Sequence, residues 1–421
     1  MSGDPRQPGA AALRVAMVDP SLFTIPYDRA LMLALRRAGH DVGLHGRPPG
    51  PEDAADGIAI DPDFYRLSSS RVVARLPNRF RLPVKGLDHV GSMLRFRRRL
   101  RRQRPDIVHF QWLPLPIVDR RLLAGLGRIA PLVLTVHDTN PFNGDPSAAL
   151  QARGFARCLP LFDHLIVHTS QGRDRLLALG LAPARVSVLP HGLIEAIPDT
   201  PAPPASGGEV TFLLFGKLKP YKGLDVLVEA FARLAEPLRA QARLRIVGKA
   251  YMAIEPIEAL ARARGVADRV SIEQRFVADD AVGALFGPDV VAVFPYREIE
   301  ASGVLSFALA RGRPVIASAL GGFADAIEDG VQGLLVPPDD AGALSLAMGR
   351  MIADRGFAAR CAVQARTLAG AMPDWDAIAA RTVTVYDAAR SRAAGRLGRP
   401  AGGTRADGSM AAPGLAVANP R

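Results

Sequence analysis

A buried strand that leads directly into a lysine-rich loop limits the fold of this sequence most. Residues 211–215 form the apolar run TFLLF, Gly216 interrupts it, and the loop KLKPYK follows. From residue 224 onward apolar side chains recur at helical spacing, so the stretch predicts a strand, a loop and a helix in succession. Since the first turn of a helix offers free N–H groups, Lys217 and Lys222 beside it predict a site for a multiply charged anion such as a diphosphate. A solvated basic loop is the alternative interpretation.

The same alternation of apolar strands and amphipathic helices occurs on both sides of one Pro-rich segment. The chain has 421 residues, enough for two or three domains, and residues 197–208 read IPDTPAPPASGG between two apolar strands. A composition of this type is typical of a linker, which divides the chain into units at 13–196 and 209–372. Strands that alternate with helices favour an α/β fold, so we expect two α/β halves with a ligand cleft between them.

The two ends of the sequence predict segments outside these halves. Residues 1–12 predict a flexible leader that lacks the layout of a signal peptide, and residues 391–421 predict a disordered tail. Residues 373–390 predict a final helix. No apolar run reaches the roughly 18 residues that span a bilayer, and the two cysteines stand far apart, so we expect a cytoplasmic protein.

A dense basic run in the first half predicts contact with an anionic partner. The net charge is +12, and residues 95–104 read RFRRRLRRQR, with a weak apolar stripe of Met93, Leu94, Phe96 and Leu100. A basic helix of this kind often lies on an anionic membrane surface, and a solvated helix face is the equal alternative. Nucleic acid is disfavoured as a partner because the run has almost no interleaved aromatic residues.

Predicted strands of the first half end in histidine, serine or threonine. The segments concerned are 106–112, 131–138, 164–170 and 186–192. Ligands of open α/β sheets bind beyond the carboxyl ends of the strands, so we expect at least one of these side chains to face a ligand. His137 is the best placed, and a structural hydrogen bond is the alternative for a lone histidine there.

A second informative stretch covers residues 294–314, FPYREIEASGVLSFALARGRP. A polar loop precedes a helix whose start is Ser302-Gly303-Val304. Ser302 is a candidate N-cap residue, and Gly303 allows a ligand to approach the backbone closely. Glu298 and Glu300 could accept hydrogen bonds from sugar hydroxyls while the N–H groups of the helix bind phosphate. Ordinary helix capping is the alternative.

In order and spacing, several segments of the chain resemble the retaining family 4 glycosyltransferases. They are LPHG at 189–192, GKLKPYKG at 216–223, ALARGRPV at 308–315 and GVQGLLVP at 330–337. The resemblance covers roughly residues 13–389. It implies the GT-B fold, in which two Rossmann-like, doubly wound α/β domains face each other across a cleft, and it implies that the C-terminal helix crosses back onto the N-terminal, acceptor-side domain.

The resemblance also implies roles for individual residues. The residues that it assigns to donor binding are Lys217, Lys222, Ser302, Gly303 and Val304. As catalytic residues it assigns His137 and Glu300, both beside the donor hexose. The chain departs from the family at Phe307, which stands where a second glutamate would contact the ribose, and the preceding loop is one residue shorter than usual.

The resemblance therefore implies a retaining, metal-independent hexosyltransferase. Its donor would be a nucleotide-diphosphate sugar and its acceptor a glycan or a lipid-linked molecule, in cell-surface polysaccharide or glycolipid synthesis. No cofactor is expected, and we interpret the Asp-Pro-Asp sequence at 61–63, in a predicted loop, as chance rather than a metal site. The alternatives are a GT-B sugar-nucleotide epimerase and a non-catalytic, basic binder of membrane surfaces. We expect a location in the cytoplasm, either free or peripheral on the inner face of the membrane.

Overall fold

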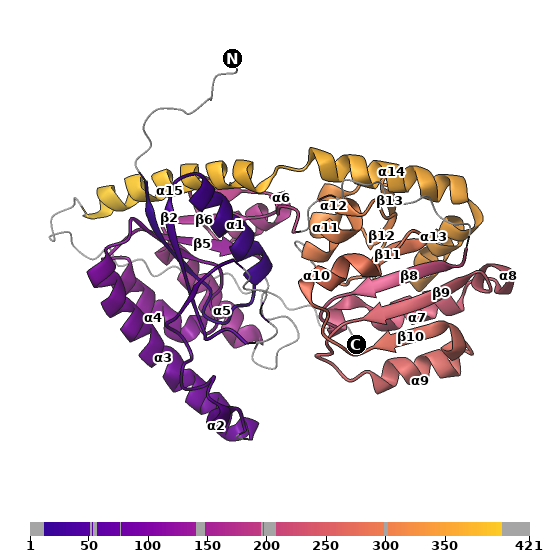
Figure 1. The fold of residues 1–421 in the computed structure, drawn as a ribbon, viewed down its shortest axis with the longest axis horizontal. Helices are drawn as coiled ribbons and strands as arrows, with labels where there is room; N and C mark the ends of the chain where they lie inside the picture. Colours follow the sequence, from indigo (N-terminus) through magenta and orange to yellow (C-terminus); the bar gives the residue numbers. More distant parts are fainter. Residues whose placement is uncertain are drawn as a thin grey trace, which may run out of the picture.

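The computed structural model describes residues 12–50, 53, 57–75, 77–139, 148–194, 197, 208–298 and 302–397. Two α/β halves lie side by side, the first on the left and the second on the right of Figure 1. The predicted α/β architecture with two Rossmann-like halves is confirmed. Residues 1–11 of the predicted leader, 398–421 of the predicted tail and 198–207 of the predicted linker lie outside the described residues. The prediction of disorder is wrong for residues 391–397, which are helical.

The first half is built on a seven-stranded parallel sheet with the order β3-β2-β1-β4-β5-β6-β7. Its strands are β1 (Arg14–Val18), β2 (Asp41–Gly46), β3 (Ile60–Pro62), β4 (Ile107–Phe110), β5 (Leu132–Val136), β6 (His164–Val167) and β7 (Val186–Val188). Its helices are α1 (Ile25–Arg37), α2 (Arg71–Ala74), α3 (Asn78–Gln103), α4 (Pro116–Leu126), α5 (Ala148–Cys158) and α6 (Ser170–Ala178), with short 3-10 turns η1 (Leu159–Leu161) and η2 (Pro183–Arg185). The strand order reverses between β1 and β4, the place where doubly wound sheets bind ligands.

The second half is built on a six-stranded parallel sheet with the order β10-β9-β8-β11-β12-β13. Its strands are β8 (Val210–Phe215), β9 (Ala242–Val247), β10 (Val270–Glu273), β11 (Val290–Phe294), β12 (Val315–Ser318) and β13 (Gly333–Val336). Its helices are α7 (Leu224–Ala232), α8 (Glu236–Arg239), α9 (Glu255–Ala263), α10 (Asp279–Val282), α11 (Gly303–Ala310), α12 (Gly321–Ala326), α13 (Ala341–Ala353) and α14 (Arg355–Ala371), with 3-10 turns η3 (Pro220–Lys222), η4 (Ala267–Arg269) and η5 (Gly283–Leu285).

The last helix, α15 (Trp375–Leu397), leaves the second half and lies over the first (Figure 1). Its side chains Ile378, Val385 and Tyr386 join the core between α1 and the sheet of the first half. Trp375 Nε1 donates a hydrogen bond to the carbonyl oxygen of Leu193 at 2.6 Å. The helix continues past residue 390, where the sequence predicted its end, because Ala393 is still buried against the first half.

The apolar stripe of the basic helix faces the interior of its own half. Met93, Phe96 and Leu100 of α3 are at most 2% exposed and belong to the core of the first sheet, whereas Leu94 is 43% exposed. The interpretation of this stripe as a surface for a membrane is therefore wrong, because the sheet covers it. The exposed arginines at this end of α3 are Arg95, Arg98, Arg101, Arg102 and Arg104. Among the described residues, no helix combines the length and the apolar character needed to cross a bilayer.

Candidate active site

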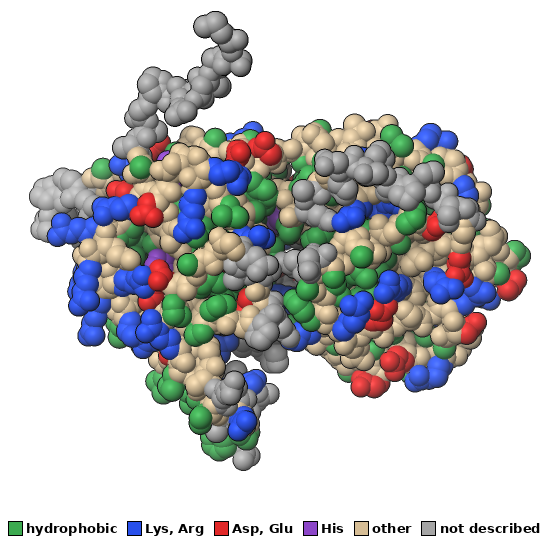
Figure 2. Space-filling model, viewed as in Figure 1, with side chains coloured by type: hydrophobic (Ala, Val, Ile, Leu, Met, Phe, Trp, Pro, Cys, Tyr) green, Lys and Arg blue, Asp and Glu red, His purple; other side chains and the backbone are tan. Residues whose placement is uncertain are grey.

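The loops at the carboxyl ends of the two sheets meet between the halves. Lys217 Nζ, from the loop after β8, lies 3.8 Å from the centre of the Phe23 ring in the loop after β1. The Ile194 amide donates to Ser306 Oγ of α11 at 3.4 Å. A Cβ at Gly303 would lie 2.7 Å from Ile194 Cδ1. Figure 2 shows the two lobes in contact along this boundary, which makes it the candidate site.

Lys222 is a buried cation at the start of α7. Lys222 is only 4% exposed, and its Nζ donates to Tyr296 Oη at 2.5 Å and to the carbonyl oxygen of Phe215 at 3.4 Å. Burial, followed by repulsion from Lys219 and Lys217, lowers the pKa of Lys222 to about 7. A lysine held in this way gains its full charge when an anion arrives.

Two glycines allow the backbone to bring Lys222 to this place. Gly223 has a φ of +65°, and a Cβ there would lie 2.1 Å from the carbonyl oxygen of Pro295 in the loop after β11. A Cβ at Gly216 would lie 3.0 Å from Lys222 Nζ and 3.4 Å from Val304 Cγ2. Only glycine permits such close packing, so the lysine loop and the start of α11 lie next to each other.

The start of α11 supplies free N–H groups beside the lysine loop. Ser302 occupies the N-cap position, but its hydroxyl makes no capping hydrogen bond. Gly303 and Val304 form the first turn. The helix N-terminus and Lys222 together form a cradle suited to a diphosphate. Glu300, the predicted contact of the hexose, lies outside the described residues, and Glu298 is the last described residue before it.

His137 stands at the carboxyl end of β5, and both nitrogens of its ring are in hydrogen bonds. His168 Nδ1 lies 3.0 Å from the carbonyl oxygen of Leu189, which can only accept, so this nitrogen carries the hydrogen. Neutral His168 then accepts at Nε2 from His137 Nδ1, 3.0 Å away. His137 Nε2 then becomes an acceptor. Gln111 Oε1, placed 3.1 Å from it, can only accept as well, so the amide group of Gln111 must be flipped to present its nitrogen.

The chain of hydrogen bonds keeps these rings neutral. Burial, with the neighbouring histidines, lowers the pKa of His137 well below its usual value of 6.5, and burial lowers that of His168 to about 3. A neutral ring with both nitrogens engaged has no proton to give to a substrate. The ring of His137 thus connects the ends of neighbouring strands beside the cleft, and its contact with a donor hexose stays a prediction.

Tyr27 of α1 stands at the centre of this cluster, and the sequence did not indicate it. Its ring centre lies 4.8 to 5.3 Å from the rings of His137, His168, His191 and Trp375. Each of these contacts joins elements distant in the sequence, and α15 contributes Trp375. Helical periodicity alone predicts that Tyr27 is buried but not which rings surround it.

Two buried carboxyl groups, Asp19 after β1 and Asp28 in α1, lie on either side of one threonine hydroxyl. The hydroxyl of Thr24 lies 3.3 Å from Asp19 Oδ2 and 3.1 Å from Asp28 Oδ1. One hydroxyl carries one hydrogen, so it can satisfy only one of the two carboxyl groups at a time. Burial correspondingly raises the pKa of both groups. Both side chains are fully enclosed, so neither can reach a substrate, and the pair holds the loop after β1.

The Asp-Pro-Asp sequence is part of an ionic cluster on the outer edge of the first sheet. Asp61 lies in the short strand β3 rather than in a loop, and Arg99 forms ion pairs with Asp61 at 2.8 Å and with Asp63 at 3.1 Å. His45 Nδ1 lies 2.8 Å from Asp63. The part of the chain that the structure describes contains no group of three or more His, Cys, Asp or Glu side chains arranged to hold a metal ion.

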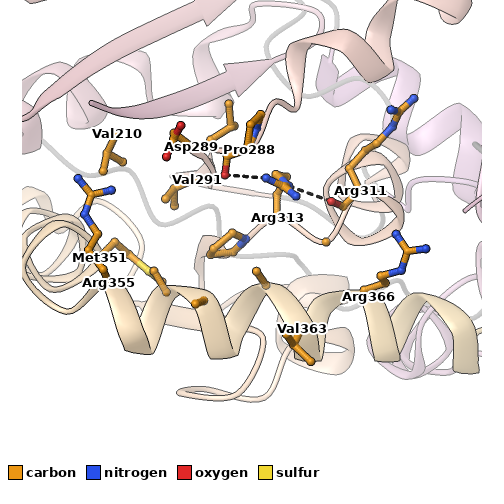
Figure 3. Close-up of a pocket in the computed structure, with 16 residues that line it drawn as sticks. Val210, Pro288, Asp289, Val291, Arg311, Arg313, Met351, Arg355, Val363 and Arg366 are labelled. Atoms are coloured by element: carbon orange, nitrogen blue, oxygen red, sulfur yellow. Dashed lines mark hydrogen bonds between the residues drawn. The ribbon is translucent and has the colours of Figure 1, made fainter. Parts of the chain in front are cut away.

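A separate cavity of about 280 Å³ lies at the amino ends of strands β8 and β11 of the second sheet, against α14 (Figure 3). Arg313 crosses it and donates to the carbonyl oxygens of Pro288 at 2.7 Å and Arg311 at 2.8 Å. Val210 and Val291 line it near the amino ends of β8 and β11. Because the lysine loop follows the carboxyl end of β8, this cavity is not part of the candidate site.

Known protein families match both halves of the chain. Residues 29–194 match the family described as Glycosyltransferase Family 4, and residues 209–354 match that described as Glycosyl transferases group 1. The D-inositol 3-phosphate glycosyltransferase of Xylanimonas cellulosilytica is 34% identical over 252 residues, which cover 55% of this chain and 58% of that protein. The corresponding enzyme of a Mycobacterium strain is 31% identical over 229 residues, 50% of this chain and 51% of its own. The chain thus spans little more than half the length of these curated relatives.

Solved structures match almost the whole chain. The Anabaena protein HepE in complex with UDP and glucose has a TM-score of 0.68 at 16% identity, over 89% of this chain and 99% of its own. The sucrose-phosphate synthase of Thermosynechococcus elongatus has a TM-score of 0.65 at 20% identity, over 89% of this chain and 98% of its own. These likenesses show the GT-B fold. With two matching family profiles in the order predicted from the sequence, the chain belongs to glycosyltransferase family 4.

Proposed function

We propose that this protein transfers a hexose from a nucleotide-diphosphate sugar to an acceptor hydroxyl, with retention of anomeric configuration and without a metal ion. The observation that carries the proposal is Lys222, buried with a lowered pKa beside the start of α11. This arrangement suits the departing diphosphate of a sugar nucleotide. The complexes of the solved relative with UDP and glucose support the class of donor.

The chemistry follows from where negative charge develops. As the bond between the anomeric carbon and the β-phosphate oxygen breaks, Lys222 and the N–H groups of α11 stabilise the leaving diphosphate. The acceptor hydroxyl attacks the same face of the sugar, and its proton passes to the leaving phosphate oxygen. Asp19 and Asp28 are enclosed and so are not placed to act as a nucleophile. We favour front-face attack within an ion-pair-like state over a covalent glycosyl intermediate. Glu300 remains our proposal for the hexose contact.

The acceptor is a glycan or a lipid-linked molecule with a polyol ring, and the product serves cell-surface polysaccharide or glycolipid synthesis. The names of the inositol phosphate-specific relatives support a ring-shaped acceptor. A GT-B sugar-nucleotide epimerase or a non-catalytic basic binder of membrane surfaces is the alternative function.

A transfer assay separates these functions. The protein is incubated with UDP-glucose and other sugar nucleotides, with and without sugar and inositol phosphate acceptors, and the products are analysed by NMR. We expect acceptor-dependent release of the nucleoside diphosphate and an α-linked product from an α-linked donor. Epimerised sugar or β-linked product would contradict the retaining transferase, and an absence of turnover with every donor would favour the binder.

The proposed role of His137 predicts a loss of turnover without loss of folding. Because the ring fixes Gln111 and His168 at the cleft, His137→Ala should lower kcat at least tenfold, which corresponds to about 1.4 kcal/mol of barrier. His164 is the matched control, since it is a buried histidine at the amino end of β6 with a hydrogen bond to Ser187. His164→Ala should leave kcat within roughly threefold of wild type. An unchanged kcat in His137→Ala would show that this ring does not contribute to turnover and would contradict the prediction.

We further propose that the protein works on the inner, anionic face of a membrane. Lys and Arg side chains gather over α3 and α4 in Figure 2. Val72 and Leu87, each 76% exposed, project from α2 and the first part of α3. Since the only acid in residues 66–104 is Asp88, which is buried, these helices combine positive charge with apolar side chains on the outside.

Binding to vesicles tests the membrane proposal. Each basic residue near an anionic surface contributes about 1 kcal/mol, so Arg101→Gln/Arg102→Gln should weaken binding to phosphatidylserine vesicles roughly 30-fold. The control Arg262→Gln/Arg381→Gln removes two exposed arginines elsewhere and should bind like wild type. If the wild-type protein shows no binding to such vesicles at low salt, the membrane proposal is wrong.

A further inference from the structure

Two aromatic rings are stacked at the cleft edge of the first half. Phe23 lies in the loop after β1 and Trp112 in the loop after β4, and these two strands are paired neighbours at the point where the strand order reverses. The ring centres of Phe23 and Trp112 are 4.7 Å apart, and the ring planes differ by 21°. Phe23 is 42% exposed, although it faces the other half of the molecule.

The loop that carries Phe23 is held firmly. Asp19 accepts hydrogen bonds from the backbone amides of Ser21 at 3.2 Å and Thr24 at 2.9 Å, and Leu22 between them has a φ of +53°. A positive φ is unfavourable for leucine, so the buried carboxyl group must hold the loop in this shape. The position of Phe23 is therefore fixed by the fold.

Lys217 covers the open face of this ring. Its Nζ lies 3.8 Å from the ring centre, and since Trp112 occupies one face of Phe23, the lysine occupies the other. Such a contact stabilises the pair by roughly 0.5 to 2 kcal/mol. A charge-assisted bond from the lysine to a diphosphate is stronger, so a bound donor can draw Lys217 away from Phe23.

We propose that the Phe23–Trp112 stack is the subsite for the ring of the acceptor, a six-membered sugar or cyclitol, and that Lys217 covers it until the donor binds. This inference rests on the proposed function. The face of an aromatic ring is electron-rich, and it therefore attracts the weakly positive C–H groups on one face of a polyol ring, just as it attracts the lysine. Donor binding then precedes acceptor binding, because the same event that fills the diphosphate site uncovers the stack.

Saturation-transfer NMR on the full-length protein tests this subsite directly. The probes are methyl α-D-glucopyranoside and D-inositol 3-phosphate, each with and without UDP. We expect saturation of the ring C–H protons of at least one probe when UDP is present, and at least a fivefold weaker signal without it. Lys217→Ala should show the strong signal in the absence of UDP, because no long side chain then covers the open face of Phe23.

Matched variants show whether the aromatic face of Phe23 is what binds the probes. Phe23→Leu retains an apolar side chain of similar size but removes the ring face, and it should lose at least fivefold of the probe signal while the UDP protons are saturated as in wild type. Phe80→Leu, at a phenylalanine of α3 that is 52% exposed, should behave like wild type. If UDP binds but the probes give equal signals in Phe23→Leu and wild type, or none in either, the subsite is wrong and the donor site stands. If UDP itself fails to bind, both the proposed function and the proposed subsite are wrong.

Discussion

Lys222→Ala is expected to lower kcat by about 100-fold, the scale of losing one group that stabilises developing negative charge. The reason is that Lys222 is the buried cation of the candidate site and lies beside the helix start that would hold the same diphosphate. The measurement is kcat at saturating donor and acceptor. Lys219→Ala is the matched control, since Lys219 lies in the same loop but is half-exposed, and it should change kcat by less than about threefold. Full activity of Lys222→Ala would contradict the assignment, as would loss of wild-type activity in EDTA.

The pKa of Lys222 adds a pH dependence to this result. Below pH 7 the lysine is charged in the free protein and in the complex, so donor affinity is at its full value. Above about pH 7 the free side chain is neutral and must take up a proton when the diphosphate raises its pKa, so donor affinity falls with rising pH. Lys222→Arg should remove this dependence, because a guanidinium remains charged. Calorimetry in buffers of different ionisation enthalpy should show proton uptake in wild type at pH 8 and none in Lys222→Arg.

Acid should destabilise the first half through its buried histidines. Burial lowers the pKa of His109 and of His168 to about 3 in the folded protein, from 6.5 when exposed. The unfolded chain then binds more protons than the folded one between pH 6.5 and pH 3, and stability is lost as the pH falls through this window. Between pH 7 and pH 5 each of the two rings should lower the free energy of unfolding by about 2 kcal/mol, which makes about 4 kcal/mol for both.

Denaturant unfolding at pH 7 and pH 5 measures this loss. His109→Gln keeps a polar side chain next to Tyr386 and Thr135, its partners at 2.9 and 2.8 Å. The variant should lose roughly 2 kcal/mol less than wild type over the same pH change. Arg381→Gln, at an exposed arginine of α15, is the control, because it leaves every histidine in place and should behave like wild type. An identical pH dependence in wild type and His109→Gln would contradict the prediction.

Local sequence patterns were sufficient for the architecture and for the lysine loop. The strand at 210–215, the glycine after it and the helical spacing from Leu224 each depend on neighbouring residues, so one sequence predicts them well. The basic helix shows the limit of the same reasoning. The spacing of Met93, Phe96 and Leu100 defines an apolar face correctly, but periodicity does not say whether a membrane or the protein's own sheet covers that face.

The features that sequence reasoning missed all depend on contacts between distant elements. The stack of Phe23 and Trp112 joins two strand ends separated by about half of the residues of the first half. The approach of Asp19 and Asp28 to one threonine hydroxyl depends on a loop shape that no sequence motif predicts. The orientation of the His137 ring likewise depends on His168. Such arrangements follow from tertiary packing, for which spacing along the chain carries no signal.

The return of α15 to the first half has a consequence for how this architecture can be recombined. The first half is discontinuous in sequence, since Ile378 and Tyr386 complete its core from the far end of the chain. A chimaera that exchanges only residues 12–194 with those of a relative would place foreign side chains under a helix shaped for this α1. Trp375, hydrogen-bonded to the carbonyl oxygen of Leu193, also brings the two chain crossings together at one point. Leu193 stands where the first connection begins and Trp375 where the second one ends, so we expect a change in the angle between the halves to bend the chain at this one place.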